Sequence, residues 1–307
     1  MTRNISDALQ KKAVIELNEN VIRRNEDIEL IRKWLNQQPH LNANLDDQYI
    51  LNFLRGCKFS LQKTKEKLDM FYTMKSLLPE FYKDRDPFRP EIQEILKLGL
   101  CLPLSHKETE PQVIFIRLSP EDPFKVKFAD VMKVSLMILD IFLKEDDNFI
   151  ISGQLGLVDF KNSTINHLLH LDLSVCKKAA TCLNFAYPTR PKGCHFVNTP
   201  GYFNKIIDTV KLWLPEKFVK RVFIYSESNI NNLYDTIPAK IIPKDSGGSG
   251  VTVKELTDYW KTKVESYRDW FIEDEKYCAN ESKRIGKHST SSDLFGVEGS
   301  FRSLSID

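Results

Sequence analysis

Residues 187–250 decide the fold and read YPTRPKGCHFVNTPGYFNKIIDTVKLWLPEKFVKRVFIYSESNINNLYDTIPAKIIPKDSGGSG. Two short apolar runs, at residues 195–197 and 222–225, are typical of β-strands, and basic residues precede each of them. Between the two runs, apolar side chains recur at helical spacing. Together these features favour a protein that contacts an anionic surface and holds an apolar ligand over a catalyst that works in water.

The segment between the two runs predicts a helix that is apolar over a wide arc. Pro200 and Gly201 fit its start, and Pro215 fits its end. The apolar positions form two adjoining faces, one with Phe203, Ile207, Val210 and Leu214 and the other with Tyr202, Ile206, Thr209 and Trp213. A surface helix normally buries one stripe. Two stripes indicate either a helix deep in the core or a helix with a second apolar partner, such as lipid.

Basic residues gather just before the two predicted strands. Arg190 and Lys192 precede the first strand, and Lys217, Lys220 and Arg221 precede the second. Because adjacent strands of a parallel sheet start at the same edge, we expect these cations to converge. Converging Arg and Lys side chains bind phosphate through charge-assisted hydrogen bonds. The alternative is a set of solvated surface charges.

The rest of the chain predicts helices first and then strands that alternate with helices. Residues 5–38 have helical spacing, and further helices are expected to begin at Asp46–Asp47 and at Ser60. Later segments predict strands at 113–116 and 155–159 and helices at 128–144, 165–185 and 251–271. This alternation predicts an α/β fold with a mostly parallel sheet. The Ser-rich tail after Lys283 is expected to be irregular, either packed against the body or partly disordered.

The composition excludes several classes of protein. The net charge of +2 over 307 residues gives no bulk field that would attract nucleic acid. The most apolar helical stretch, residues 131–143, is too short to span a bilayer. Six cysteines without a zinc-type CxxC pair, in a chain with no apolar leader, predict free thiols and a cytoplasmic protein.

Motifs of common enzymes are missing from the chain. The run GGSG at residues 247–250 lacks the Lys-Ser/Thr of a phosphate loop, and there is no GxSxG or HExxH. His167 and His170 lie three residues apart without an evident carboxylate or thiol partner, so we predict no metal site. Cys194 and His195 would point to opposite faces of a strand. We predict no catalytic residues and no cofactor.

Several of these segments resemble the CRAL-TRIO family of lipid-binding proteins. The motifs YPTRPKGCHFVNTP, EKFVKR and IIPKDSGG, together with the apolar helix, are similar to the family's lipid-binding domain. Residues 46–69, DDQYILNFLRGCKFSLQKTKEKLD, resemble its helical N-terminal module, and the tail from Tyr267 resembles that of insect alpha-tocopherol-transfer-like proteins. The resemblance implies a helical module at 1–85, a lipid-binding domain with a mobile gate helix at 86–275, and a C-terminal extension at 276–307.

The resemblance also assigns site residues. It implies that Arg190, Lys192, Lys217 and Arg221 bind phosphoinositide headgroups. It implies that Phe203, Ile207, Val210 and Leu214 face a ligand, and that Tyr202, Ile206, Trp213, Ile165 and Leu169 contact membrane. Two positions depart from the family pattern, because Cys57 replaces a commonly basic residue and Thr209 a commonly apolar one.

The ligand cavity follows from the resemblance in the same way. Its lining is expected to include Ser135, Leu139, Val158, Leu171, Ala179, Cys182, Leu183 and Tyr187. Ser135 and Tyr187 are the expected polar anchors, and Ala179 and Cys182 are small enough to leave room for a bulky ring or polyene. For each of these residues the alternative is ordinary core packing.

The expected function is that of a monomeric, cytoplasmic carrier that docks transiently on phosphoinositide-containing membranes. Its ligand would be a small hydrophobic lipid such as a tocopherol, a retinoid, a carotenoid or a similar isoprenoid. Two alternatives stay open, namely a phosphoinositide-dependent trafficking adaptor and a lipid-modifying α/β enzyme.

Overall fold

A computed structural model of the chain describes residues 2–105, 107–118, 123–161, 163–170, 172–201, 216–226 and 229–296, together with Phe203, Asp208 and Lys211. Within these residues, no helix combines the length and apolar character needed to cross a membrane.

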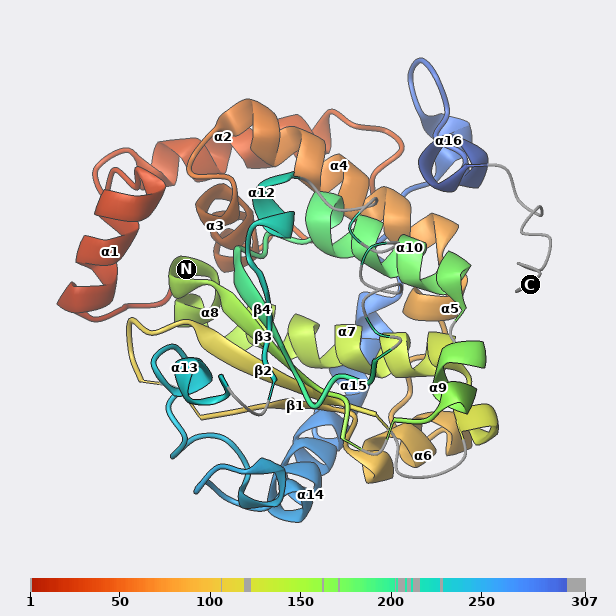
Figure 1. Cartoon of the computed structure of the whole chain (residues 1–307). Helices are drawn as coiled ribbons and strands as arrows, with labels where there is room; N and C mark the ends of the chain where they lie inside the picture. The colour runs from red at the N-terminus through yellow and green to blue at the C-terminus, as the bar shows by residue number, and fades with distance from the viewer. Residues whose placement is uncertain are drawn as a thin grey trace.

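A five-stranded sheet lies at the centre of the fold, with its strands side by side in chain order (Figure 1). The strands are β1 (Cys101–Pro103), β2 (Gln112–Arg117), β3 (Gln154–Asp159), β4 (Pro191–Val197) and β5 (Val222–Ile224). β1 is antiparallel to β2, and the other pairs are parallel. The predicted α/β class and mostly parallel sheet are therefore confirmed. The sequence did not predict β1, since three residues are too few for a periodic signal.

The N-terminal third is helical, as expected. Its helices are α1 (Asp7–Leu17), α2 (Arg24–Asn36), α3 (Asp47–Gly56), α4 (Leu61–Leu77), α5 (Pro79–Tyr82) and α6 (Pro90–Leu98). The Asp46 carboxylate accepts from the backbone N–H of Tyr49, and the Ser60 hydroxyl from that of Lys63, which confirms both predicted helix starts. The single helix expected over residues 5–38 is two, because Asn18 ends α1 in the left-handed conformation at φ 60°.

The segments between the strands form short and long helices. They are the 3-10 turn η1 (Pro123–Lys125), α7 (Phe128–Glu145), α8 (Asp147–Ser152), α9 (Ile165–Leu169), α10 (Leu173–Thr181), the π-helical turn η2 (Cys182–Ala186) and α12 (Glu216–Val219). The helix expected over residues 165–185 is therefore interrupted. The Asp172 carboxylate accepts from the backbone N–H groups of Ser174 and Val175 and so begins a new helix.

The C-terminal part returns to the body of the protein. It consists of α13 (Asn231–Tyr234), η3 (Lys244–Ser246), α14 (Val253–Glu265), α15 (Arg268–Asp274), η4 (Glu281–Lys283) and α16 (Ser291–Phe295). Thr252 and Glu255 form a capping box at the start of α14. The Lys177 ammonium donates to the Phe295 carbonyl at 2.6 Å, so the described part of the tail packs against α10.

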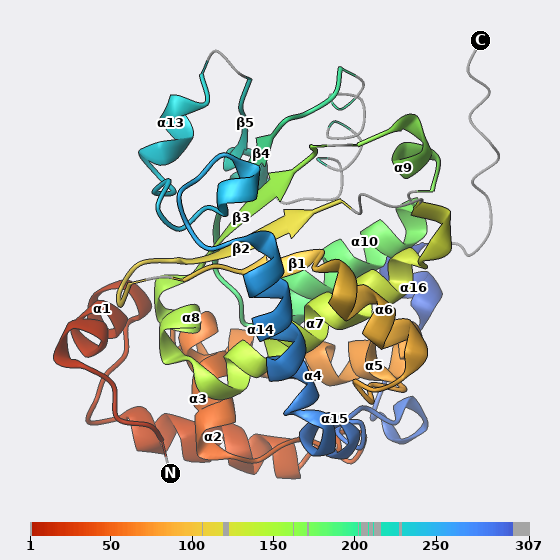
Figure 2. The same cartoon turned by 90° about the horizontal axis from the view of Figure 1, so that it is seen from below.

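One hydrophobic core joins the helical N-terminal part to the sheet, and it includes residues from Ile28 to Ala279. A second, small cluster of Leu9, Ala13, Leu17 and Ile151 fixes α1 on α8. Both views place α1 and α8 at one end of the molecule and α6 and α9 at the other (Figures 1 and 2). The proposed boundaries at residues 85 and 275 stay a prediction.

Candidate functional site

Three of the four predicted headgroup-binding residues meet where β4 and β5 begin. The exposed Arg221 guanidinium donates to the Pro191 carbonyl at 2.7 Å, and the Arg221 carbonyl accepts from the Cys194 backbone N–H at 2.8 Å. Arg221 therefore lies beside the chain segment that carries Arg190 and Lys192. We refer to Arg190, Lys192, Lys217 and Arg221 as the basic cluster.

Arg190 is fixed in place by its surroundings. Its guanidinium donates to the carbonyl of Ile151 at the end of α8, and its side chain is only 12% exposed. The neighbouring Gly153 has φ 84°, and a Cβ there would lie 2.4 Å from the Arg190 carbonyl oxygen. The close approach of β3 to Arg190 therefore requires glycine at position 153.

Lys217 lies exposed on α12, close to a cation that the sequence analysis did not identify. The Lys67 ammonium of α4 donates to the carbonyls of Asn184 at 3.1 Å and Tyr187 at 2.9 Å. Burial lowers the pKa of Lys67, and the positive charge of Lys217 lowers it further. The N-terminal helices thus add positive charge to this side of the molecule.

An acidic side chain that sequence reasoning missed also lies in the basic cluster. One carboxylate oxygen of Glu16, on α1, is 3.0 Å from Arg190 Nη2 and 3.2 Å from Lys192 Nζ. Burial raises the pKa of Glu16, but its hydrogen bonds from Arg190 and Lys192 outweigh burial and leave that pKa below its ordinary value. No sequence pattern links Glu16 to residues so distant in the chain.

One face of the sheet carries an incompletely covered row of apolar side chains. Ile116, Val158, Phe196 and Ile224 are lateral partners across β2, β3, β4 and β5. Ile116 is 39% exposed and Ile224 is 37% exposed, while the other two are half-buried. Both faces of a mostly parallel sheet are usually covered, so this row is a candidate binding surface for an apolar ligand. We call it the apolar row.

Sequence reasoning identified one member of the apolar row, Val158. The other three share its face because laterally paired residues point to the same side of a sheet. The adjacent lateral row contains Gly156 and Cys194, which are small. Strand register was therefore the missing information, and strand lengths alone could not supply it.

Several predicted lining residues lie near the same face. Ser135 and Leu139 on α7 and Leu183 on η2 are half-buried. Ser135 interacts with the thiol of Cys101, the lateral partner of Ile116, so α7 covers the face of the apolar row. The Ser135 hydroxyl donates to the Val131 carbonyl at 2.8 Å, which leaves only its lone pairs for a ligand.

Ala179, Cys182 and Tyr187 are packed more tightly than the resemblance implied. Ala179 is buried, and Cys182 and Tyr187 are completely covered by other protein groups. The Tyr187 hydroxyl already donates to Asp140 at 2.9 Å, and its ring contacts the edge of Phe71. Direct contact with a ligand would require these neighbours to move, and a lining role for the three residues stays a prediction.

Most of the predicted gate helix lies outside the described residues, as do Leu171 and the membrane-facing positions 202, 206 and 213. The ligand-facing positions 207, 210 and 214 lie outside them too. Phe203 is described and buried, with ring centroids 4.5 Å from Phe160 and 5.1 Å from Phe196. It therefore lies against the apolar row. Ile165 and Leu169 of α9 are 54% and 69% exposed, as a membrane contact would need.

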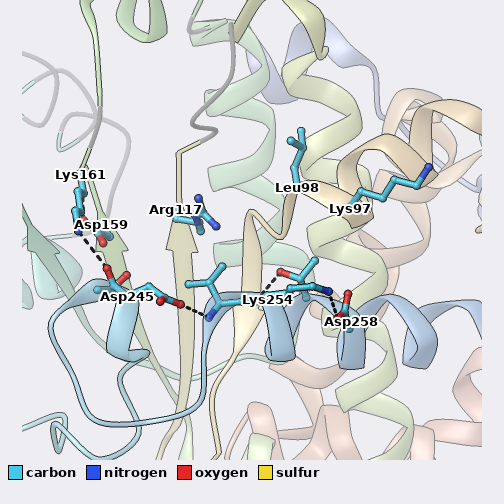
Figure 3. Close-up of a pocket in the computed structure, with 11 residues that line it drawn as sticks. Lys97, Leu98, Arg117, Asp159, Lys161, Asp245, Lys254 and Asp258 are labelled. Atoms are coloured by element: carbon cyan, nitrogen blue, oxygen red, sulfur yellow. Dashed lines mark hydrogen bonds and ion pairs between the residues drawn. The ribbon is translucent and has the colours of Figure 1, made fainter.

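A cavity of about 610 Å³ is drawn in Figure 3. It lies where β2 and β3 end, whereas the basic cluster lies where β4 and β5 begin. Arg117, the last residue of β2, faces it beside its lateral partner Asp159. Lys161 donates to the Asp245 carbonyl at 3.1 Å, and Lys254 pairs with a carboxylate of α14. No described residue forms a hydrogen bond or ion pair with the Arg117 guanidinium. Burial lowers the pKa of Arg117, and the negative charges of Asp159 and Asp245 act against that lowering.

The described residues contain no cluster of His, Cys, Asp or Glu that would hold a metal ion. His170 lies 2.8 Å from the Val126 carbonyl, and His167 contacts Thr164, so the two rings have separate partners. His195 Nδ1 lies 2.9 Å from the Tyr225 hydroxyl. Burial raises the pKa of the neighbouring Cys194 thiol to about 12, which keeps it protonated and a weak nucleophile at neutral pH.

Comparison with known proteins adds family relationships to this geometry. Residues 97–248 match the family model described as CRAL/TRIO domain, and residues 20–92 match the one described as Pinta-like, UBA domain. The alpha-tocopherol transfer protein-like protein of Homo sapiens is 26% identical over 275 residues, which cover 88% of this chain and 78% of that protein.

Two further similarities accompany these matches. Clavesin-1 of Rattus norvegicus is 28% identical over 241 residues, covering 78% of this chain and 68% of that protein. Among solved structures, the crystal structure of Sfh5 aligns with a TM-score of 0.46 and 13% identity, over 85% of this chain and 98% of that one.

Proposed function

Because the chain belongs to the CRAL-TRIO family, we propose that it carries a small hydrophobic lipid and exchanges it with membranes that contain phosphoinositides. Family membership supports a lipid-transfer protein rather than an enzyme. The finer proposal concerns the class of ligand and the membrane that donates or accepts it.

The apolar row is the observation that carries the proposal. A sheet face that leaves Ile116 and Ile224 more than a third exposed forgoes roughly 25 cal/mol for each Å² of apolar surface in water. A hydrophobic ligand that covers this surface recovers that free energy. Gly156 and Cys194 beside the row offer little side-chain bulk and so leave room for a ring or a polyene.

Docking on a membrane would combine two weak signals. The basic cluster supplies attraction for phosphate groups, and the exposed Ile165 and Leu169 supply an apolar contact. Each signal alone gives marginal, reversible binding, whereas the two together give transient peripheral attachment. An opening of the segment around Phe203 would expose the apolar row. Contact with lipid would compensate the free-energy cost of that exposure.

The first experiment is native mass spectrometry with organic extraction of the protein purified from its own tissue. One hydrophobic molecule at near one per chain would support the carrier and identify its ligand. The absence of a ligand, or scattered phospholipid only, would contradict the carrier and favour the adaptor.

The membrane part is tested by transfer of a fluorescent tocopherol analogue to vesicles with and without phosphatidylinositol bisphosphate. Lys217→Ala combined with Arg221→Ala should slow transfer to the phosphoinositide vesicles only. The matched control, Lys276→Ala with Lys287→Ala, removes the same charge from exposed side chains after α15 and in the tail. Equal rates for the two double variants would overturn the role of the basic cluster.

A further inference from the structure

We propose that Glu16 competes with headgroups for Arg190 and Lys192, so that only headgroups charged strongly enough to displace it, such as multiply phosphorylated inositol lipids, bind the basic cluster appreciably. This inference rests on the proposed function, because it concerns the selectivity of the same docking site. It assigns a specificity role to the N-terminal helix α1.

The geometry makes Glu16 a competitor for the ligand. The same oxygen, Oε2, accepts hydrogen bonds from Arg190 Nη2 and Lys192 Nζ. The other oxygen lies 3.8 Å from the ammonium of Lys12 on the same helix. A phosphate bound by Arg190 and Lys192 would use these same donors, so it has to replace the Glu16 carboxylate.

The competitor is held near the site even after it has been displaced. α1 is anchored through Leu9, Ala13 and Leu17 against Ile151. Glu19, directly after α1, forms a completely buried ion pair with Arg55 at 2.8 Å. By contrast, the Glu16 side chain is 33% exposed, and rotation of this side chain alone frees the two cations. The carboxylate therefore competes at a high effective concentration.

The charge of the headgroup determines how readily it displaces the Glu16 carboxylate. A phosphodiester or carboxylate headgroup with one negative charge only substitutes for the charge that Glu16 already provides. A phosphomonoester carries about 1.5 to 2 negative charges and three acceptor oxygens, so it gains from the exchange. A second phosphate could reach Lys217 and Arg221, which form no ion pairs with the described residues. The net gain therefore grows with the number of phosphates.

The test compares binding to two vesicles of equal surface charge, one with phosphatidylserine and one with phosphatidylinositol bisphosphate in phosphatidylcholine. Glu16→Gln keeps the size of the side chain and removes its charge. Because a partly exposed ion pair contributes up to about 1 kcal/mol, we expect the variant to bind both kinds of vesicle up to about five-fold more tightly. The ratio between the two affinities should change little, because both headgroups displace the same carboxylate, and binding to phosphatidylserine vesicles should become detectable at a lower protein concentration.

Glu94→Gln is the matched control, since Glu94 is exposed on α6, at the far end of the molecule from α1 (Figure 2). A thermal melt of each variant checks that the fold is kept. If Lys217→Ala with Arg221→Ala abolishes docking while Glu16→Gln leaves both affinities unchanged, the inference on Glu16 is wrong and the proposed function stands. If the wild-type protein does not distinguish bisphosphate vesicles from neutral ones, the proposed docking itself is wrong.

Discussion

The Tyr187 hydroxyl donates a hydrogen bond of 2.9 Å to Asp140, whose other carboxylate oxygen accepts from the Arg85 guanidinium at 2.5 Å. Arg85 also lies 3.5 Å from Asp274, which pairs with Lys75. All five side chains are buried. This network joins α4, α7 and α15 to the segment that leads into the basic cluster, so it fixes the position of that segment.

Removal of one member of this network should be costly. Asp140→Ala leaves the Arg85 guanidinium buried without its closest counter-charge, and breaking a buried ion pair in this way costs about 3–5 kcal/mol. We expect urea denaturation to show this loss in the free energy of unfolding. Asp130→Ala on the same helix, where the carboxylate is only half-buried, should cost less than about 1 kcal/mol. Similar losses for the two variants would contradict a structural role for the network.

Stability should depend on pH through His195. Burial lowers the pKa of His195, so the folded state disfavours the charged ring. The unfolded chain binds the proton more readily, and stability is therefore complete above the unfolded pKa of about 6.5 and declines as pH falls below it. Thermal melts between pH 7.5 and 5.5 should show a smaller decline for His195→Gln than for the wild type. Parallel curves would show that another group causes the decline.

A polar substitution in the apolar row should weaken binding of the hydrophobic ligand. Val158→Asn places an amide against a ligand that offers it no hydrogen-bond partner, at a cost of about 1–3 kcal/mol. Fluorescence titration with a tocopherol analogue or with all-trans retinal should then give at least about five-fold weaker binding. Ile22→Asn, on an exposed residue between α1 and α2, is the control. Unchanged affinity in Val158→Asn would place the ligand elsewhere.

If α9 contacts the membrane, a charged substitution on α9 should weaken binding to vesicles. Leu169→Asp replaces a side chain whose burial in lipid contributes about 1.5–3 kcal/mol, so vesicle partitioning should fall at least about tenfold. Ile285→Asp changes an even more exposed aliphatic residue in the tail and should leave partitioning unchanged. Sedimentation with bisphosphate-containing vesicles measures both. Equal partitioning of the two variants would exclude α9 from the membrane contact.

The sequence predicted much of the fold because most of its signals are local. Short apolar runs located β2 to β5, and the side chains of Asp46 and Ser60 marked helix starts that the structure confirms. The breaks at Asn18 and Asp172 were missed, since each depends on one residue within a longer periodic run. β1 was missed because of its length.

The candidate site was less predictable because it depends on contacts between distant segments. The convergence of Arg190, Lys192 and Arg221 followed from strand direction alone. Glu16 did not, because only the packing of α1 on α8 brings it to the cations. The Arg117 cavity was also missed, since its walls come from separated elements and Arg117 ends a strand that otherwise looks like ordinary core.

Both outermost strands of the sheet, β1 and β5, are only three residues long. An edge strand offers unpaired backbone groups with which another chain can pair, and a short edge limits that pairing. Under the proposed function, an apolar sheet face is uncovered each time lipid is taken up or released, and self-association is then favoured. Two short edges would limit aggregation at those moments, independently of the ligand.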